Sequence, residues 1–145
     1  MAYDVEKLLD QSDTELDNLF GRSKAGPIPD GPAEGTAIAA NDSKFAAVIS
    51  RLVTHFVWQG KTFDAKRGTL RNRVGVFGSE AIVAQVYLGT SLLDGKECII
   101  LDYSKTSDVA EHLRDEIRQI APGTYLGRVY WKQKPSLHFA LQFGG

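Results

Sequence analysis

The sequence has little of what would place the protein outside the cell or in a membrane. Cys98 is the single cysteine, so no disulfide can form within the chain, which is typical of proteins in a reducing compartment. No apolar run approaches the roughly 18 residues that a membrane span needs. Met1 to Lys7 carries acidic residues where a signal peptide would carry a basic run. We therefore expect a cytoplasmic protein without a membrane span.

The chain also lacks an excess of charge of either sign. Lys and Arg number 17 and Asp and Glu 18, which leaves a formal net charge of -1. A nucleic-acid-binding surface usually leaves a basic imbalance, so we expect no nucleic-acid partner. The hydrophobic fraction of 43% over 145 residues is ordinary for a globular protein. We expect one domain over residues 1–145, and the composition leaves a homodimer open.

Signatures of cofactor, metal and thiol chemistry are missing as well. The glycine-containing stretch Pro29–Gly31 is not followed by the Gly-Lys-Ser/Thr of a phosphate-binding loop. His55, His112 and His138 fall on three different predicted elements, without the local spacing of metal ligands. Cys98 lies in an apolar stretch typical of a buried strand, which favours a structural thiol over a nucleophile. We expect no metal and no cofactor.

The N-terminal region, residues 1–32, reads as a helical cover followed by a loop. Apolar residues recur at helical intervals over residues 4–20, and Ser12 with Glu15 fits a capping box. Residues 25–32 contain three prolines and two glycines, which excludes regular structure there.

Two further helices are predicted within the remainder, residues 33–145. Residues 43–57 carry apolar side chains at i, i+3, i+4, i+7, i+8 and i+11 after a serine cap. Residues 107–120 show a buried stripe that ends at Pro122-Gly123. The stripe consists of Val109, Leu113, Ile117 and Ile120.

From residue 58 onward the period of the apolar residues is two, which predicts strands. Gly78-Ser79 and Asp94-Gly95 stand between neighbouring runs as tight turns, so the strands pair antiparallel. Closure into a barrel removes the sheet edges, and the predicted fold is α+β, mainly β, an antiparallel barrel with an N-terminal helix and two inserted helices. The predicted strands are 33–40, 58–63, 69–77, 80–88, 97–103, 124–132 and 136–143.

One candidate binding site is the strand that begins at Trp58. Trp58 and Phe63 could form an apolar wall at a barrel mouth, with Lys61 as a rim charge for an acidic ligand. The alternative is ordinary hairpin chemistry, in which Lys61 keeps a sheet edge soluble.

The aromatic residues of the sheet add further ligand-binding candidates, namely Tyr87, Tyr103, Tyr125 and Trp131. In a hollow barrel such rings line the lumen and their hydroxyls provide fixed polar contacts. In a packed core they only fill space. Both interpretations stay open at the level of the sequence.

The candidates for catalysis are Asp102 and Tyr103, because a general base needs a carboxylate beside a second polar group within a cavity. Glu116, on the predicted helix 107–120, could meet Asp102 or Tyr103 in a polar cluster beside the barrel. The alternative is a solvated helix face, on which Arg114 and Arg118 are paired with nearby acids.

The sequence resembles the calycin group, which comprises the lipocalin-like and fatty-acid-binding-like barrels, including uncharacterised bacterial members. The features that carry the resemblance are the N-terminal helical cover, the entry strand Trp58–Asp64, the turns at Gly78-Ser79 and Asp94-Gly95, and the closing strand Gly123–Arg128. The resemblance covers about residues 30–143. It implies a lipocalin-like barrel that binds a small apolar or amphipathic molecule.

Two functional hypotheses follow, besides an interaction or structural role. The first is a carrier or sensor of a fatty-acid-like or polyketide-like ligand. The second is a small cup-shaped enzyme, an isomerase, cyclase or hydratase, which uses a carboxylate such as Asp102 with a Tyr or His partner. An ionisable pair inside the barrel would favour the enzyme, and a lone cation at an apolar mouth would favour the carrier.

Overall fold

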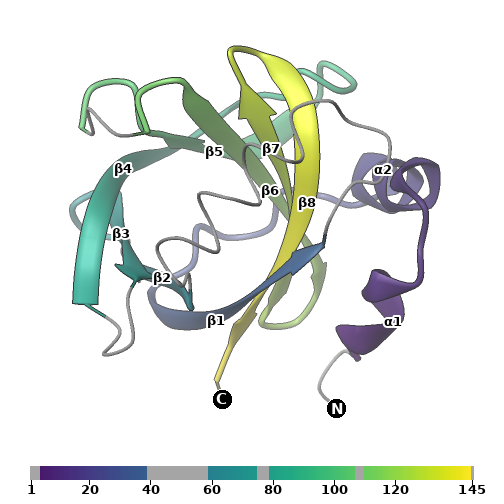
Figure 1. The fold of residues 1–145 in the computed structure, drawn as a ribbon, viewed down its shortest axis with the longest axis horizontal. Coiled ribbons are helices and arrows are strands. Elements are labelled where there is room, and N and C mark those ends of the chain that lie inside the picture. Colours follow the sequence, from purple (N-terminus) through teal and green to yellow (C-terminus); the bar gives the residue numbers. More distant parts are fainter. Residues whose placement is uncertain (1–3, 39–58, 75–78, 107–109, 145) are drawn as a thin grey trace.

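The computed structural model describes residues 4–38, 59–74, 79–106 and 110–144, which form a closed eight-stranded antiparallel β-barrel with two short helices (Figure 1). Each strand pairs with the next along the chain, and β8 pairs with β1. The strands are β1 (Gly31–Ile38), β2 (Gly60–Asp64), β3 (Thr69–Val74), β4 (Ser79–Thr90), β5 (Glu97–Asp102), β6 (Leu113–Ala121), β7 (Thr124–Trp131) and β8 (Lys134–Phe143). The prediction of a mainly-β antiparallel barrel is confirmed.

Each of the seven predicted strands overlaps an observed strand, and the turn at Asp94-Gly95 connects β4 to β5, with Gly95 at a φ of 73°. Three predicted features lie outside the described residues: the helix over residues 43–57, the ligand-binding candidate Trp58, and Gly78 of the predicted turn Gly78-Ser79. No helix within the described ranges is long and apolar enough to cross a membrane.

The prediction of a helix over residues 107–120 is wrong, because Leu113–Ala121 is strand β6. Leu113 and Ile117 pack in the barrel interior, whereas Ile120 packs in a second cluster on the outside of the barrel. A strand that is buried on both faces carries apolar residues on both faces. Here Leu113, Ile117 and Ile120 are spaced by four and then three residues, which is also the spacing of an apolar helix face. Pairing with β5 and β7 decides the conformation.

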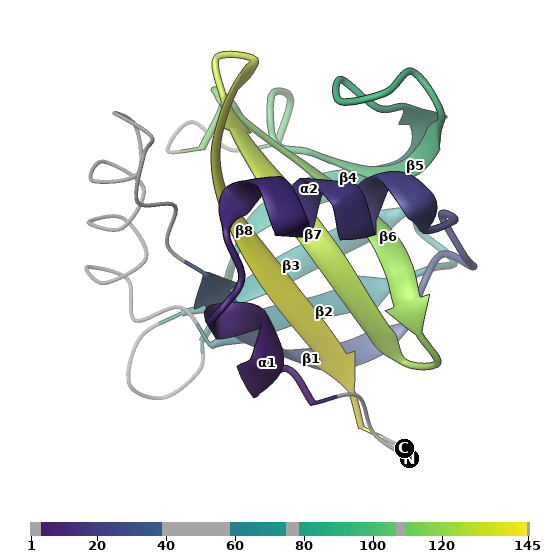
Figure 2. The same ribbon diagram turned by 90° about the vertical axis from the view of Figure 1, so that its right-hand side faces the viewer.

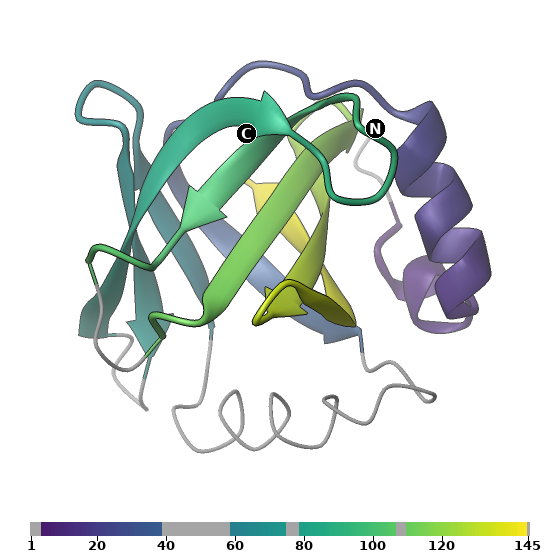
Figure 3. The ribbon, with the colours of Figure 1, turned by 90° about the horizontal axis from the view of Figure 1, so that it is seen from above.

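The helices α1 (Glu6–Leu9) and α2 (Asp13–Arg22) cover one side of the barrel (Figures 2 and 3). The predicted capping box starts α2: Ser12 Oγ accepts from the Glu15 amide at 3.1 Å, and Glu15 Oε1 accepts from the Ser12 amide at 3.2 Å. The helices and the strands beneath them form the outer cluster, which comprises Val5, Leu8, Leu16, Phe20, Ile38, Cys98, Ile100, Leu126 and Ala140.

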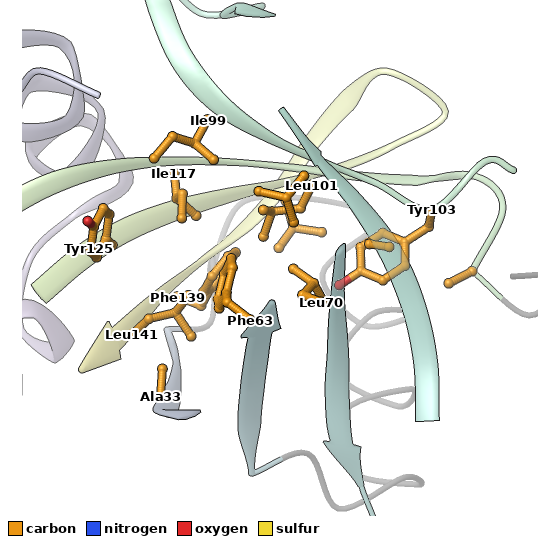
Figure 4. Packing of buried hydrophobic residues seen from close by; sticks show 14 of the residues in the cluster. Ala33, Phe63, Leu70, Ile99, Leu101, Tyr103, Ile117, Tyr125, Phe139 and Leu141 are labelled. Carbon is orange, nitrogen blue, oxygen red and sulfur yellow. The ribbon is translucent and has the colours of Figure 1, made fainter. Parts of the chain in front are cut away.

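Alternating residues of the strands form a separate core inside the barrel (Figure 4). On β8 the predicted alternation is observed, because Leu137, Phe139 and Leu141 point inward. Gly127 on β7 makes room for the Phe139 ring, since a Cβ at residue 127 would lie 2.2 Å from Cζ of Phe139. The Phe139 ring therefore packs directly against the backbone of β7.

Arg118 on β6 joins the helical cover to the barrel. Its side chain is fully buried, and the guanidinium lies over the Phe20 ring at 4.5 Å. It donates to both carboxylate oxygens of Asp94 at 2.7 and 2.8 Å, to the Phe20 carbonyl at 2.9 Å and to the Glu97 carbonyl at 3.0 Å. The hydrogen bonds from Arg118 lower the pKa of Asp94 to about 2.

A second polar anchor lies under the same helix. Asp17 on α2 accepts from Arg128 Nε at 2.8 Å and contacts His138 Nε2 at 2.7 Å. Burial alone would raise the pKa of Asp17, but these two contacts outweigh it and hold the pKa below its usual range. Asp17 of the cover thus contacts outward-facing side chains of both β7 and β8.

The Asp94–Arg118 contact should make folding sensitive to acid. An unfolded aspartate has a pKa of about 3.9, whereas Asp94 in the folded protein has a pKa of about 2. Between these values the unfolded state binds more protons, so the free energy of unfolding should fall as the pH falls from about 4 to about 2. Urea unfolding at several pH values should show that the unfolding free energy of Asp94→Asn declines less over this pH range than that of the unmodified protein. As a control, Asp64→Asn removes a half-exposed carboxylate and should leave the decline as it is in the unmodified protein. Equal slopes for Asp94→Asn and the unmodified protein would contradict the stabilising role of this contact.

Candidate functional site

Among the described residues, four polar side chains point into a barrel interior that is otherwise built from apolar side chains. They are Lys61 on β2, Asn72 on β3, Tyr103 directly after β5 and Asp115 on β6. Each residue is between 2% and 5% exposed. Strand alternation places them there, because their neighbours two positions away are interior core residues. Those neighbours are Phe63, Leu70, Leu101 and Ile117. We call these four polar residues the interior polar cluster.

Lys61 lies at the centre of the interior polar cluster. Its Nζ is 2.8 Å from Asn72 Oδ1, 2.7 Å from the Tyr103 hydroxyl and 3.3 Å from Asp115 Oδ2. These three oxygens equal in number the three N–H groups of an ammonium. The ammonium also lies 5.4 Å from the centroids of both the Tyr103 and Phe139 rings. Lys61 is therefore an interior residue, and the prediction of a rim charge is wrong.

The orientation of the Asn72 amide follows from its surroundings. Its Nδ2 donates to the Ile82 carbonyl at 2.8 Å and to the Tyr103 hydroxyl at 2.9 Å. A carbonyl can only accept, so the NH₂ group must face Ile82 and the amide oxygen must face Lys61. Asn72 thus holds both Lys61 and Tyr103 in place.

The hydroxyl of Tyr103 accepts two hydrogen bonds, one from Lys61 and one from Asn72. Its own proton is directed at Asp115 Oδ2, which is 3.5 Å away. Good O–H···O hydrogen bonds measure about 2.7–2.8 Å, so this one is long and weak. Among the donors of the interior polar cluster, the Tyr103 hydroxyl makes the longest hydrogen bond to a described residue.

Burial dominates the electrostatics of the interior polar cluster. It raises the pKa of Asp115 and the pKa of Tyr103, because both charged forms lose water. Burial also acts to lower the pKa of Lys61, but the neighbouring Tyr103 and Asp115 outweigh it and the pKa is raised. Lys61 is therefore protonated, and its charge opposes, without overcoming, the effect of burial on the pKa of Asp115. As an ion pair at 3.3 Å, the two groups are neutral as a unit.

The interior polar cluster lies toward one end of the barrel. Lys61 is at the beginning of β2, Asn72 near the end of β3 and Asp115 near the beginning of β6, and in antiparallel strands these positions share one end. In Figure 4 Tyr103 and Tyr125 stand at opposite ends of the labelled row, with Leu70 and Phe139 between them. The interior is thus polar toward one end and apolar toward the other.

The other predicted binding residues are dispersed. Phe63 and Tyr125 belong to the interior core, each near the Phe143 ring at 5.6 Å, and the Tyr125 hydroxyl donates to the Pro27 carbonyl at 2.6 Å. Trp131 is half-buried against the same core, and its ring meets His112 edge-on at 5.5 Å. Trp58 lies outside the described residues.

Tyr87 and Asp102 do not face the interior, contrary to prediction. Tyr87 is 40% exposed and donates to Asp102 Oδ2 at 2.7 Å on the outside of the sheet. Asp102 also accepts from the hydroxyl and the amide of Ser104. Tyr103 is one position further along the chain than Asp102, and strand alternation sends it to the opposite face. Of the two catalytic candidates, only Tyr103 belongs to the interior polar cluster.

The predicted contact of Glu116 with Asp102 or Tyr103 is wrong, because Glu116 faces outward. It accepts from Ser91 Oγ at 2.6 Å, from the Leu92 amide at 2.8 Å and from Arg114 Nη2 at 2.8 Å. Its neighbour Asp115 takes the interior position. Residues 113–121 form a strand, so odd-numbered positions such as 115 face the interior and even-numbered ones the outside.

Sequence reasoning missed Asn72 and Asp115. The signal for Asn72 was a polar residue on the same face as Leu70 in an alternating strand. Asp115 stands between Leu113 and Ile117 in the same way, a pattern that was hidden by the helical interpretation.

Cys98 is buried in the outer cluster, as predicted, and burial raises its pKa to about 12. A thiol with so high a pKa is a poor nucleophile. Within the described part of the chain, no group of three His, Cys, Asp or Glu residues could hold a metal ion.

The Lys61–Asp115 pair should be strongly coupled. Lys61→Met leaves Asp115 buried without its cation, and Asp115→Leu leaves Lys61 without its anion, so each should cost about 3–5 kcal/mol of unfolding free energy. The double variant removes both charges and should lie within about 1 kcal/mol of the unmodified protein. Urea unfolding of the four proteins gives the coupling energy. Strictly additive losses would show that the two charges do not depend on one another.

Comparison with known proteins yields a likeness of fold. No protein-family model matches the chain, and no curated protein matches it. Among solved structures, the chain is similar to a protein from Thermomonospora curvata, described in its crystal structure without a function. The TM-score is 0.68 at 16% sequence identity, and the match covers 97% of this chain and 94% of the other. At that identity the likeness concerns the barrel with its helical cover and carries no function.

Proposed function

We propose that the barrel interior binds a small, largely apolar molecule, whose polar group lies against the interior polar cluster. The observation that carries this proposal is the convergence of Lys61, Asn72, Tyr103 and Asp115 at one end of an apolar interior. Small-molecule sites are mostly apolar, with a few convergent polar groups that fix orientation and specificity.

Energetics support a ligand-binding role over a purely structural one. A buried ion pair gives up the hydration of both charges, and well-packed apolar residues in its place are often as stable or more stable. The rest of the interior is built from such apolar residues. The cost of the polar residues is understandable if they recognise a ligand.

The resemblance to the calycin group supports the same proposal by analogy of fold. A closed eight-stranded antiparallel barrel is also the architecture of the lipocalins. A carrier of a small apolar or amphipathic molecule, acting in the cytoplasm, is therefore the leading hypothesis.

Titration with 2-octanone and, separately, with octanoate tests this proposal. Saturable binding of either, with NMR shifts concentrated at interior residues such as Tyr103 and Phe139, is the expected result. Tyr103→Phe should alter the affinity for 2-octanone, whereas the matched change Tyr87→Phe removes a hydroxyl on the outer face and should not. If neither compound binds saturably up to its solubility limit, or if the shifts lie on the outer face alone, the proposal fails.

A second candidate is an enzyme, favoured by the ionisable pair Lys61–Asp115 beside Tyr103. Asp115 would take a proton from the carbon next to a carbonyl, while Tyr103 donates a hydrogen bond to the oxygen on which negative charge develops. Returning that proton to another carbon completes an isomerisation without a co-reactant. Burial raises the pKa of Asp115, which makes it a stronger base.

Hydrogen exchange tests this second candidate. With 2-octanone in D₂O, the protein should accelerate deuterium incorporation next to the carbonyl, observed by NMR, and Asp115→Asn should abolish the acceleration. Asp102→Asn, which removes the neighbouring carboxylate on the outer face, should exchange at the unmodified rate. Full activity in Asp115→Asn, or no acceleration by the unmodified protein, would rule out this chemistry for the ketone.

A further inference from the structure

We propose that the ligand presents an uncharged oxygen, such as the carbonyl of a ketone or ester, which accepts a hydrogen bond from the Tyr103 hydroxyl. The inference rests on the proposed function and specifies its ligand class. It replaces the expectation that Lys61 recognises an acidic ligand.

Among the described residues, the charge balance inside the barrel argues against an anion. Lys61 already lies 3.3 Å from Asp115 and accounts for that negative charge. A ligand carboxylate in the same place would put two negative charges against one positive charge in a buried environment. A ligand ammonium would leave two positive charges against Asp115. A neutral group leaves the charges of Lys61 and Asp115 balanced.

The arginines of β6 and β7 do not change this balance. Arg114, Arg118 and Arg128 occupy the alternate positions of β6 and β7, which face outward. Each is paired with an acid on that side, at 2.7 to 2.8 Å. The acids are Glu116, Asp94 and Asp17, respectively. These guanidinium groups therefore do not supply the missing charge for an interior anion.

The hydrogen-bonding pattern identifies the donor. Lys61 faces three oxygens, and the two N–H groups of Asn72 are directed at Ile82 and Tyr103. Within the described residues, the Tyr103 proton, by contrast, has only the long 3.5 Å contact to Asp115. A ligand oxygen at normal distance would be a better partner for it. Because the Tyr103 oxygen accepts from an ammonium, its O–H is polarised and donates more strongly.

Three probes of equal chain length separate the possibilities: 2-octanone, octanoate and octylammonium, each titrated near pH 7.5 by calorimetry. We expect 2-octanone to bind about tenfold more tightly than either ion, a ratio that corresponds to a difference of about 1.4 kcal/mol. Octanoate or octylammonium binding as tightly as the ketone would overturn this inference while leaving the proposed function intact. Binding of none of the three would overturn both.

Two variants assign the recognition to residues. Tyr103→Phe should weaken 2-octanone about three- to tenfold, the range expected for one hydrogen bond, and should leave octanoate nearly unchanged. Tyr87→Phe, the matched control, should change neither. Equal losses for the ketone in both variants would overturn the role of Tyr103.

Asp115→Asn tests the charge argument directly. Removing the anion leaves the Lys61 charge uncompensated, so the affinity for octanoate should rise relative to the affinity for 2-octanone. An unchanged ratio in the folded variant would overturn the argument. If this variant does not fold, as judged by circular dichroism, the ranking of the three probes and the Tyr103→Phe ratio still decide the inference.

Discussion

Burial of strands β5 to β8 on both faces is the constraint on which the rest of the structure depends. Their inner faces line the barrel, and their outer faces lie under α1 and α2. A barrel strand exposed on one side needs apolar residues on the other side only. Here the outer side is also covered, so each charged group on it must find a partner there. Arg118 with Asp94, and Arg128 with Asp17, meet this requirement. The Arg128–Asp17 pair and the hydrogen bond from Arg118 to the Phe20 carbonyl attach the cover.

The same constraint explains which parts of the fold could be predicted from the sequence. On β8 the residues that face the interior are large and those between them mostly polar or small, so the period of two is clear. On β6 apolar residues serve two separate cores, and Leu113, Ile117 and Ile120 fall at helical spacing by coincidence. Local pattern could not resolve this, because the conformation depends on pairing with strands far along the chain.

The residues of the candidate site were likewise predictable from the sequence only in part. Tyr103 and Lys61 were identified because aromatic and charged residues stood out in their strands. Asn72 was not, since a polar residue in a strand is expected to face water unless the register is known. Asp115 was placed on the predicted helix 107–120, so its position inside the barrel was missed. A shift of one residue along a strand exchanges the faces, and the sequence alone does not specify that register.

The interior polar cluster also differs in kind from the ion pairs outside the barrel. Arg118 and Arg128 connect the cover to strands, so their partners lie on separate layers that must be held together. Lys61, Asn72, Tyr103 and Asp115 all belong to the barrel wall, which backbone pairing already closes. Holding layers together therefore does not account for the interior polar cluster. A charge pair that cancels itself, beside a donor with a poor partner, is better suited to orienting a neutral molecule than to attracting a charged one.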